Sequence, residues 1–250
     1  MKKGVKSLIK TAVPPRMLKL YRDRRVAHAR AVNEHLSTKE VFTRIYRDKK
    51  WSVSSGSEFQ SGSGSTEPIA EQYASFVADF INQRAVSSVV DLGCGDFNVG
   101  RRIAVAGVRY VGVDIVDDLI SNNLRKFADR GIDFRCLNIV EDDLPAGELC
   151  LVRQVFQHLS NTEILAVLPK LARYKYVLIT EHYPAFTSGI VPNLDKPHGE
   201  DTRLFDNSAV YLDKAPFALA GVSEVFSVDA PPIVARGEKL TTVLLDNTAA

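Results

Sequence analysis

Apolar and polar residues follow two periods along the chain, one typical of amphipathic helices and one typical of buried strands. From residue 69 to residue 86 apolar side chains recur every three or four positions, which predicts a helix. Residues 87–92 then form a short stretch with apolar Val89, Val90 and Leu92, which predicts a buried strand. The alternation continues with predicted helices over 99–106, 118–130 and 162–173 and predicted strands over 110–115, 132–139, 149–155 and 176–180.

The C-terminal part departs from this alternation. Two strands are predicted over 222–228 and 240–245, with only a short connection containing Pro and Gly between them. A parallel pair needs a crossover of about a dozen residues or more, so these two strands are expected to pair antiparallel. The sequence therefore predicts an α/β protein with a Rossmann-like sheet of five parallel strands and a C-terminal antiparallel hairpin.

The length of 250 residues suits one such domain with an extension. We expect a basic helical extension over 1–50, a Ser/Gly-rich segment over 51–66 and the main domain over 67–250. A Ser/Gly-rich stretch is typical of a flexible linker, which is one interpretation of 51–66. Within the main domain, 183–218 is a long insertion before the hairpin, and insertions of this length are usually functional or disordered.

Charge is distributed unevenly, although the formal net charge is only +2. Residues 1–30 hold ten Lys or Arg against the single acid Asp23, so this segment carries +9 and the remainder −7. Such a helix can lie on an anionic membrane surface, and a solvated basic tail is the alternative. Nucleic-acid binding is disfavoured, because no aromatic residue interleaves with the charges before Tyr21. The apolar positions are Val5, Leu8, Ile9 and Val13 before a break at Pro14 and Pro15, and Met17, Leu18 and Tyr21 after it.

Cysteine content and hydropathy indicate a cytoplasmic protein, which the basic extension would hold at the inner face of the membrane. Cys94, Cys136 and Cys150 are odd in number and lack CxxC spacing, which argues against disulfides or a zinc site. No apolar run approaches the ~20 residues of a membrane-spanning helix. Lys6 and Lys10 interrupt the first apolar stretch, so no secretory signal is predicted.

The strongest chemical signal is the sequence DLGCGD at 91–96, where a predicted strand enters a Gly-x-Gly turn ahead of a helix. Glycines let the backbone turn sharply and approach a ligand, and the following helix N-terminus presents free N–H groups. A dinucleotide-binding G-x-G-x-x-G motif would need glycine where Asn98 stands, which disfavours a nicotinamide cofactor.

Polar side chains also end the next two predicted strands. Asp114 lies 19 residues after Gly95, about the separation at which a carboxylate can accept bonds from a ribose. Ile115 follows it, and Asn138 with Ile139 ends the third strand. Each alone is explained by a strand-end polar cap, but open sheets bind ligands at this edge, so together they predict a nucleoside site.

These features resemble class I S-adenosylmethionine-dependent methyltransferases. The resemblance covers about residues 67–182 and rests on DLGCGD (91–96), GVDI (112–115), NIVEDDLP (138–145) and RQVFQHLS (153–160). It implies S-adenosyl-L-methionine as the cofactor and no metal ion. The family more often has aspartate in place of Asn138, but an amide oxygen can also accept from the adenine amino group. It implies cofactor contacts from Asp91, Gly93, Gly95 and Asp96 near the methionine part, Asp114 at the ribose, Ile115, Asn138 and Ile139 at the adenine, and Arg153 and Gln154 at cofactor or substrate.

A narrower resemblance is to a bacterial subgroup with a tryptophan and an S-G-x-G-S element before the first strand. It implies that residues 51–66 cover the cofactor or substrate, which is the alternative to a linker, and it implies no particular substrate. The matching residues are Trp51, 61–65, 94–97, Arg153, His158, Leu159, Asn193, Asp195, Gly199, Arg203, Pro216 and Phe217.

Methyl transfer from a sulfonium mainly needs alignment, and a hydroxyl nucleophile also benefits from a general base. His158, past the fourth strand, is the first candidate, and Glu181 and His182, expected just after the fifth strand, are the others. Each has a structural alternative as a cap or a packed side chain. The insertion is expected to form part of the acceptor pocket, with polar residues that suit a polyhydroxylated compound: Tyr183, Asn193, Asp195, His198, Asp201 and Arg203.

The leading hypothesis is O-methylation of a small-molecule or glycan-like acceptor. The first alternative is a non-catalytic scaffold protein that binds S-adenosylmethionine, which the intact Asp91, Gly93, Gly95 and Asp114 disfavour. The second is an NAD-dependent oxidoreductase, which Asn98 and the closing hairpin disfavour.

Overall fold

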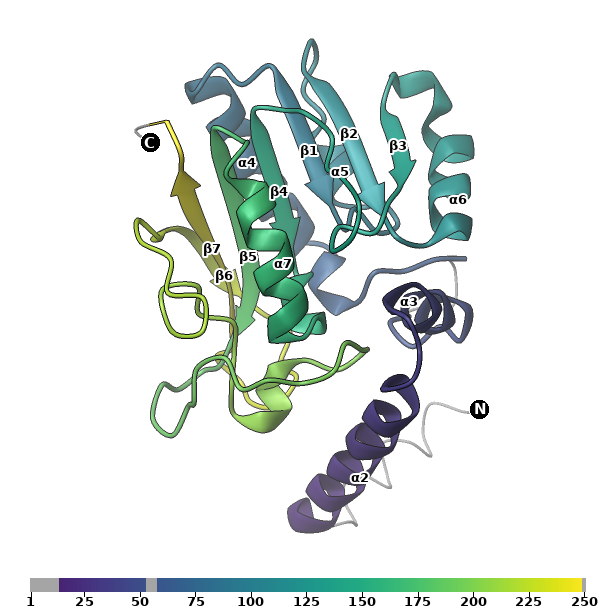
Figure 1. Ribbon diagram of the computed structural model, residues 1–250, viewed down its shortest axis with the longest axis vertical. Coiled ribbons are helices and arrows are strands. Elements are labelled where there is room, and N and C mark those ends of the chain that lie inside the picture. Colours follow the sequence, from purple (N-terminus) through teal and green to yellow (C-terminus); the bar gives the residue numbers. More distant parts are fainter. Residues whose placement is uncertain (1–13, 53–57, 249–250) are drawn as a thin grey trace.

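The computed structural model describes residues 14–52 and 58–248 and contains a seven-stranded sheet in the order β3-β2-β1-β4-β5-β7-β6 (Figure 1). The first five strands pair in parallel, and β7 pairs antiparallel with both β5 and β6. The predicted sheet of five parallel strands with a C-terminal hairpin is therefore confirmed. The strands are β1 (Ser88–Leu92), β2 (Arg109–Asp114), β3 (Asp133–Cys136), β4 (Leu149–Arg153), β5 (Tyr176–Tyr183), β6 (Ser223–Asp229) and β7 (Lys239–Asp246).

Helices cover both faces of the sheet, because residues of each strand point alternately to opposite sides. Val90 and Val152 pack in one core with α7, whereas Val89 and Leu151 pack in another with α4. Figure 1 shows α7 in front of β4 and β5 and α4 behind the sheet. The helices of this part are α4 (Ile69–Gln83), α5 (Gly100–Ile103), α6 (Asp117–Phe127) and α7 (Asn161–Leu171), with 3₁₀ turns η1 (Ser63–Ser65), η2 (Ala128–Arg130), η3 (Phe156–His158) and η4 (Arg203–Asp206).

The strand order changes direction at β1, which lies between β2 and β4. The chain leaves β1 toward β2 and β3 and later returns to the other side at β4. In open α/β sheets ligands bind outside the carboxyl ends of the strands at such a point. The fold therefore predicts a ligand site among the loops that follow β1, β2 and β4.

Of the boundaries that differ from the prediction, those of α5, β3 and β5 bear on the site. Helix α5 has a single turn, because Ala104 leaves the helical backbone region before the turn that leads into β2. Strand β3 ends at Cys136, so Asn138 lies in the following loop. Strand β5 runs on to Tyr183, because β7 pairs with it along its whole length, so Glu181 and His182 lie within β5 and do not follow it.

The N-terminal extension contains α2 (Pro15–Asn33) and α3 (Thr38–Arg47). Ser37 and Glu40 form a capping box at the start of α3, and Tyr46 from its buried face packs against Val116 and Leu119 after β2. The expected apolar face of Val5, Leu8, Ile9 and Val13 lies outside the described residues. In 14–52 and 58–248, no helix is long and apolar enough to cross a membrane.

Candidate active site

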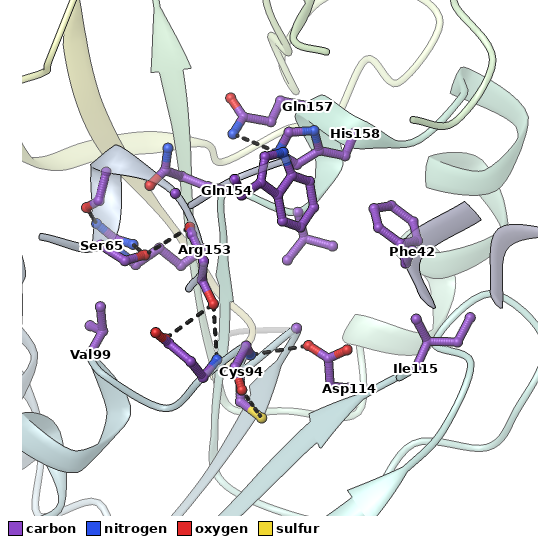
Figure 2. A pocket seen from close by; sticks show the side chains of 18 of the residues that line it. Phe42, Ser65, Cys94, Val99, Asp114, Ile115, Arg153, Gln154, Gln157 and His158 are labelled. Carbon is purple, nitrogen blue, oxygen red and sulfur yellow. Dashed lines mark hydrogen bonds between the residues drawn. The ribbon is translucent and has the colours of Figure 1, made fainter. Parts of the chain in front are cut away.

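A cavity of about 340 Å³ lies at the carboxyl ends of β1, β2 and β4 (Figure 2). The ends of these strands, the loops that follow them and the loop after β3 bring together all ten residues expected to contact a cofactor. His158 and His182 also line the cavity, whereas Glu181 does not. The ten residues are Asp91, Gly93, Gly95, Asp96, Asp114, Ile115, Asn138, Ile139, Arg153 and Gln154.

The glycine turn after β1 is held tightly between its neighbours. Gly93 donates its N–H to the Val113 carbonyl at 2.8 Å and has a positive φ of 74°. A Cβ atom added to Gly93 would collide with Val155 in the loop after β4. Glycine is therefore required here both by the left-handed backbone and by the close approach of the next loop.

Two buried carboxylates, Asp91 and Asp114, lie beside this turn. Asp91 accepts a hydrogen bond from the Tyr110 hydroxyl at 2.9 Å, and Asp114 accepts the Gly95 N–H at 3.0 Å. Burial raises the pKa of Asp91 to about 6, against the opposing effects of the Tyr110 hydrogen bond and the Arg153 charge. Burial likewise raises the pKa of Asp114 to about 6, although backbone N–H groups act to lower it. The ionised forms are destabilised, which favours a ligand that brings positive charge or hydrogen-bond donors.

Residues 58–66 lie over the glycine turn and join it to the N-terminal extension. Ser61 accepts the Asp96 N–H at 2.9 Å, donates to the Asp96 carboxylate at 3.1 Å and lies 3.0 Å from the Tyr46 hydroxyl. Asn98 donates to the Ser65 carbonyl at 2.7 Å. Residues 61–65 all line the cavity, so this segment forms one of its walls.

Arg153 at the end of β4 fastens the same segment from the other side. Its guanidinium donates to the Gly64 carbonyl at 2.5 Å and to the Ser65 hydroxyl at 3.3 Å, and it lies 4.9 Å from the centre of the Tyr73 ring. Its Nε is buried and has no partner among the described residues. The next residue, Gln154, has a positive φ of 55°, an uncommon backbone conformation for a side chain of this size.

The opposite end of the cavity is more apolar. Figure 2 shows Ile115 and Phe42 on the side away from Arg153. Asn138 also lines the cavity; its side-chain oxygen accepts the Val140 N–H at 3.0 Å, which leaves its amide NH₂ group and a second lone pair for a ligand.

His158 is fixed by two hydrogen bonds. Its Nδ1 donates to the Gly199 carbonyl at 3.1 Å, so Nε2 is the acceptor and receives the Gln157 amide at 3.2 Å. Desolvation lowers the pKa of His158 to about 3. The imidazole therefore stays neutral, and its lone pair already has a donor.

The two residues of β5 differ in their surroundings. The Glu181 carboxylate accepts the N–H groups of Phe156 and Gln157 at 2.9 and 3.0 Å, and burial raises the pKa of Glu181 to about 8. This side chain anchors the loop after β4 behind the cavity wall. His182 Nε2 lies 3.0 Å from a Glu238 oxygen, and burial lowers the pKa of His182 while Glu238 acts in the opposite direction.

The insertion at 183–218 contributes Glu200 and Thr202 to the cavity wall. Two other polar residues of the insertion, Asn193 and Arg203, were expected to line the acceptor pocket but form hydrogen bonds to the backbone. The Asn193 amide donates to the carbonyls of Tyr211 and Ala215 at 2.8 and 2.9 Å, and the buried Arg203 donates twice to the Leu159 carbonyl.

Sequence reasoning did not single out Tyr46, Tyr73, Gln157, Thr202 or Glu238. A signal for Tyr46 was available, since the capping box marks the start of α3 and the spacing of Val41, Ile45 and Tyr46 marks its buried face. No local pattern marks Glu238, which reaches the cavity region only through the pairing of β7 with β5. Within 14–52 and 58–248, no group of three or more His, Cys, Asp or Glu side chains is placed to hold a metal ion.

No family model matches the sequence, and a comparison with curated proteins gives no match. Among solved structures, the chain is similar to the magnesium protoporphyrin IX methyltransferase of Synechocystis with bound S-adenosylhomocysteine, with a TM-score of 0.52 and 14% identity over 83% of this chain and 99% of that one. It is similar to the N-methyltransferase NodS of Bradyrhizobium japonicum, with a TM-score of 0.50 and 14% identity over 71% and 96% of the two chains.

A third similar structure is an S-adenosylmethionine-dependent methyltransferase of Clostridium acetobutylicum, with a TM-score of 0.50 and 10% identity over 71% of this chain and 92% of that one. At these identities the likeness concerns the fold. The chain has the fold of the class I methyltransferases.

Proposed function

We propose that this protein is an S-adenosylmethionine-dependent methyltransferase that acts on a hydroxyl group of a small-molecule or glycan-like acceptor. The observation that carries the proposal is the meeting of two buried carboxylates, Asp91 and Asp114, at one cavity beside the glycine turn. The shared fold supports it, since the Synechocystis structure contains S-adenosylhomocysteine.

The chemistry of the cavity fits this cofactor group by group. Asp91 matches the ammonium group of the methionine part, and Arg153, whose Nε has no partner within 14–52 and 58–248, matches the carboxylate. Asp114 can accept bonds from both ribose hydroxyls, and Asn138 with Ile115 suits the polar edge and flat face of adenine. No side chain in this set is left with a mismatched charge.

When bound, S-adenosylmethionine supplies a methyl group that leaves its sulfonium as an acceptor oxygen forms the new C–O bond. The residues of this chain align the acceptor and remove its hydroxyl proton. We propose His182 as the base, because it lines the cavity and the Glu238 carboxylate lies 3.0 Å from its Nε2. A lone pair on His182 Nε2 would be repelled by the carboxylate oxygen at that distance, so the neutral imidazole carries its hydrogen on Nε2. The other ring nitrogen, Nδ1, then accepts the proton of the acceptor hydroxyl.

Glu238 is positioned to stabilise the resulting imidazolium. Its two oxygens accept the N–H groups of Ile233, Val234 and Ala235, each at 2.7 Å, which fixes the carboxylate in place. We expect His182→Gln to lower kcat about 10²–10⁴-fold with little change in S-adenosylhomocysteine affinity. A matched variant, His28→Gln on α2, should leave both quantities unchanged. Equal kcat in the His182 variant and the parent would remove it from the base role.

Cofactor binding is tested by titrating S-adenosylhomocysteine into the parent, an Asp114→Asn variant and an Asp117→Asn control three residues away on the surface. We expect Asp114→Asn to weaken binding about tenfold or more, since hydrogen bonds to a charged group contribute about 1.5–3 kcal/mol. Comparing the thermal shifts with NAD and with S-adenosylhomocysteine distinguishes an oxidoreductase from a methyltransferase, because a ligand that binds the native state raises its melting temperature. Mass spectrometry of extracts incubated with a labelled methyl donor separates an enzyme from a scaffold that only binds the cofactor.

We further propose that α2 docks on the anionic inner face of a membrane. Met17, Leu20 and Tyr21 are 61%, 53% and 65% exposed, and the exposed Arg24 and Arg25 extend the same side of the helix. Apolar side chains beside arginines suit insertion at the headgroup level, with about 1 kcal/mol from each basic residue. A double Arg24→Glu, Arg25→Glu variant should lose sedimentation with phosphatidylserine vesicles; unchanged sedimentation would contradict this docking.

A further inference from the structure

The end of the cavity beside η3 carries two buried polar atoms that have no partner among the described residues. They are Oε1 of Gln157 and Oγ1 of Thr202, whose side chains line the cavity and belong to residues only 5% and 6% exposed. An unsatisfied buried polar atom destabilises a folded protein unless a ligand or water provides the missing bond. Both side chains line the cavity, so a compound bound there is placed to provide the missing bonds.

The orientation of Gln157 follows from its neighbour. Because His158 Nδ1 donates to the Gly199 carbonyl, His158 Nε2 must accept, and the Gln157 amide nitrogen donates to it at 3.2 Å. The Gln157 oxygen is then left as an acceptor that requires a donor. Figure 2 shows Gln157 and His158 across the cavity from Asp114, away from the residues assigned to the ribose.

Trp51 supplies an aromatic face at the same end. Its ring centre lies 4.8 Å from that of His158, and its Nε1 donates to the Glu200 carbonyl at 3.2 Å, two residues before Thr202. The indole N–H is therefore already satisfied, and the ring offers only its apolar surface to the cavity. An apolar face beside two unpaired polar atoms suits a compound that presents both C–H groups and hydroxyls.

Two lysines near this end are paired with carboxylates. The Nζ atom of Lys50 lies 3.8 Å from Oε1 of Glu200, and the Nζ atom of the buried Lys196 lies 3.8 Å from Oδ1 of Asp201. Desolvation keeps His158 neutral by lowering its pKa to about 3. An ionised acceptor would lose its hydration here without gaining a counter-charge, whereas a neutral one would not.

We infer that this end of the cavity binds a neutral acceptor with at least two hydroxyl groups, of the monosaccharide or cyclitol type. Gln157 accepts from one hydroxyl, Thr202 pairs with a second, and Trp51 packs against the C–H face. The role of this compound as methyl acceptor rests on the proposed function, but its binding does not.

The test is calorimetric titration with D-glucose and myo-inositol against the charged analogues D-glucuronate and D-glucosamine, with catechol as a flat apolar diol. Titrations are run with and without saturating S-adenosylhomocysteine. We expect at least one neutral polyol to bind, and both charged analogues to bind at least tenfold more weakly. Tighter binding of a charged analogue, binding of catechol alone, or no binding of either neutral polyol overturns the inference.

Two variants locate the binding. Thr202→Val and Gln157→Met each remove one proposed hydrogen bond to the polyol at nearly constant volume and should raise its Kd about tenfold. Gln157→Met also removes the bond to His158 Nε2, so Thr202→Val is the cleaner of the two variants. The control Thr241→Val removes a buried hydroxyl that bonds Ser227 outside the cavity, and it should leave that Kd unchanged.

The melting temperature of Thr202→Val distinguishes binding of the polyol from a purely structural role of the Thr202 hydroxyl. Because Thr202 Oγ1 has no described partner, Thr202→Val should keep or raise the melting temperature. A lower melting temperature with unchanged polyol affinity would show that the hydroxyl serves the fold and would overturn the inference. If S-adenosylhomocysteine fails to bind the parent, the proposed function fails, while the titrations without it still decide whether the polyol site exists.

Discussion

Lowering the pH from about 7.5 to about 5 should weaken the binding of S-adenosylhomocysteine, because Asp91 must be ionised to pair with the ammonium group of the ligand. Burial raises the pKa of Asp91 to about 6 in the free protein. The ligand's positive charge favours the ionised carboxylate, so the pKa falls on binding and protons are released. The affinity for S-adenosylhomocysteine is therefore highest above about pH 7, where Asp91 is ionised, and it declines as the pH falls through 6.

The size of the change in Kd follows from the fraction of Asp91 that is ionised. At pH 5 a group with a pKa of about 6 is only about one-tenth ionised, so Kd should rise about tenfold, equivalent to about 1.4 kcal/mol. Asp114 has a similarly raised pKa of about 6. In the proposed complex its partners are neutral hydroxyls, from which a protonated carboxyl can still accept a hydrogen bond, so Asp114 adds less to the pH dependence.

Isothermal calorimetry at several pH values, in two buffers of different ionisation enthalpy, measures both Kd and the protons released. An Asp91→Asn variant should bind weakly at every pH and lose the tenfold dependence, whereas the surface variant Asp118→Asn should keep it. Circular dichroism at pH 5 checks that the protein remains folded. A parent Kd that stays constant between pH 5 and 7.5, with no proton release near pH 6, would refute the pairing of Asp91 with the ligand.

Two predictions concern the scaffold. Gly93→Ala should destabilise the protein by about 1–3 kcal/mol more than Gly107→Ala in urea unfolding, since both glycines have positive φ but only a Cβ at Gly93 meets a neighbouring side chain. Glu163→Gln should lower the free energy of unfolding by about 1–3 kcal/mol near pH 7. Burial acts to raise the pKa of Glu163, but hydrogen bonds from His198 and Ser160 lower it to about 2, so its stabilising effect is present above its ordinary pKa and is lost as the pH falls toward 2. Equal stabilities within each pair, measured at matched pH, would contradict these assignments.

The sequence was sufficient for the sheet and for the residues at its carboxyl edge. Strand and helix periods differ, and the carboxyl ends of parallel strands lie at one edge of a sheet, so the ends of β1 and β2 were expected side by side, and Asp91 and Asp114 both line the cavity there. The importance of Asp91 came from the resemblance to methyltransferases. The short C-terminal connection likewise fixed the antiparallel pairing of β7.

Local patterns could not show what long-range contacts decide. The end of β5 depends on how far β7 pairs with it, and this pairing places Glu181 and His182 within a strand, where alternate side chains point to opposite faces. Glu181 consequently turns to the backbone of η3, while His182 lines the cavity. The partner Glu238 lies in the connection of a distant hairpin, so no spacing rule relates it to His182.

The wall formed by residues 58–66 has a consequence for how the protein can be shortened. Ser61 bridges Tyr46 of α3 and Asp96 of the glycine turn, and Arg153 holds Gly64 from the sheet. A fragment trimmed to the repeating strands and helices, 67–248, would keep every carboxylate at the sheet edge yet leave them open to water. Because residues 61–65 line the cavity, a chain that starts at residue 67 would lack this wall, and ligand screens on it would miss compounds that bind the full chain.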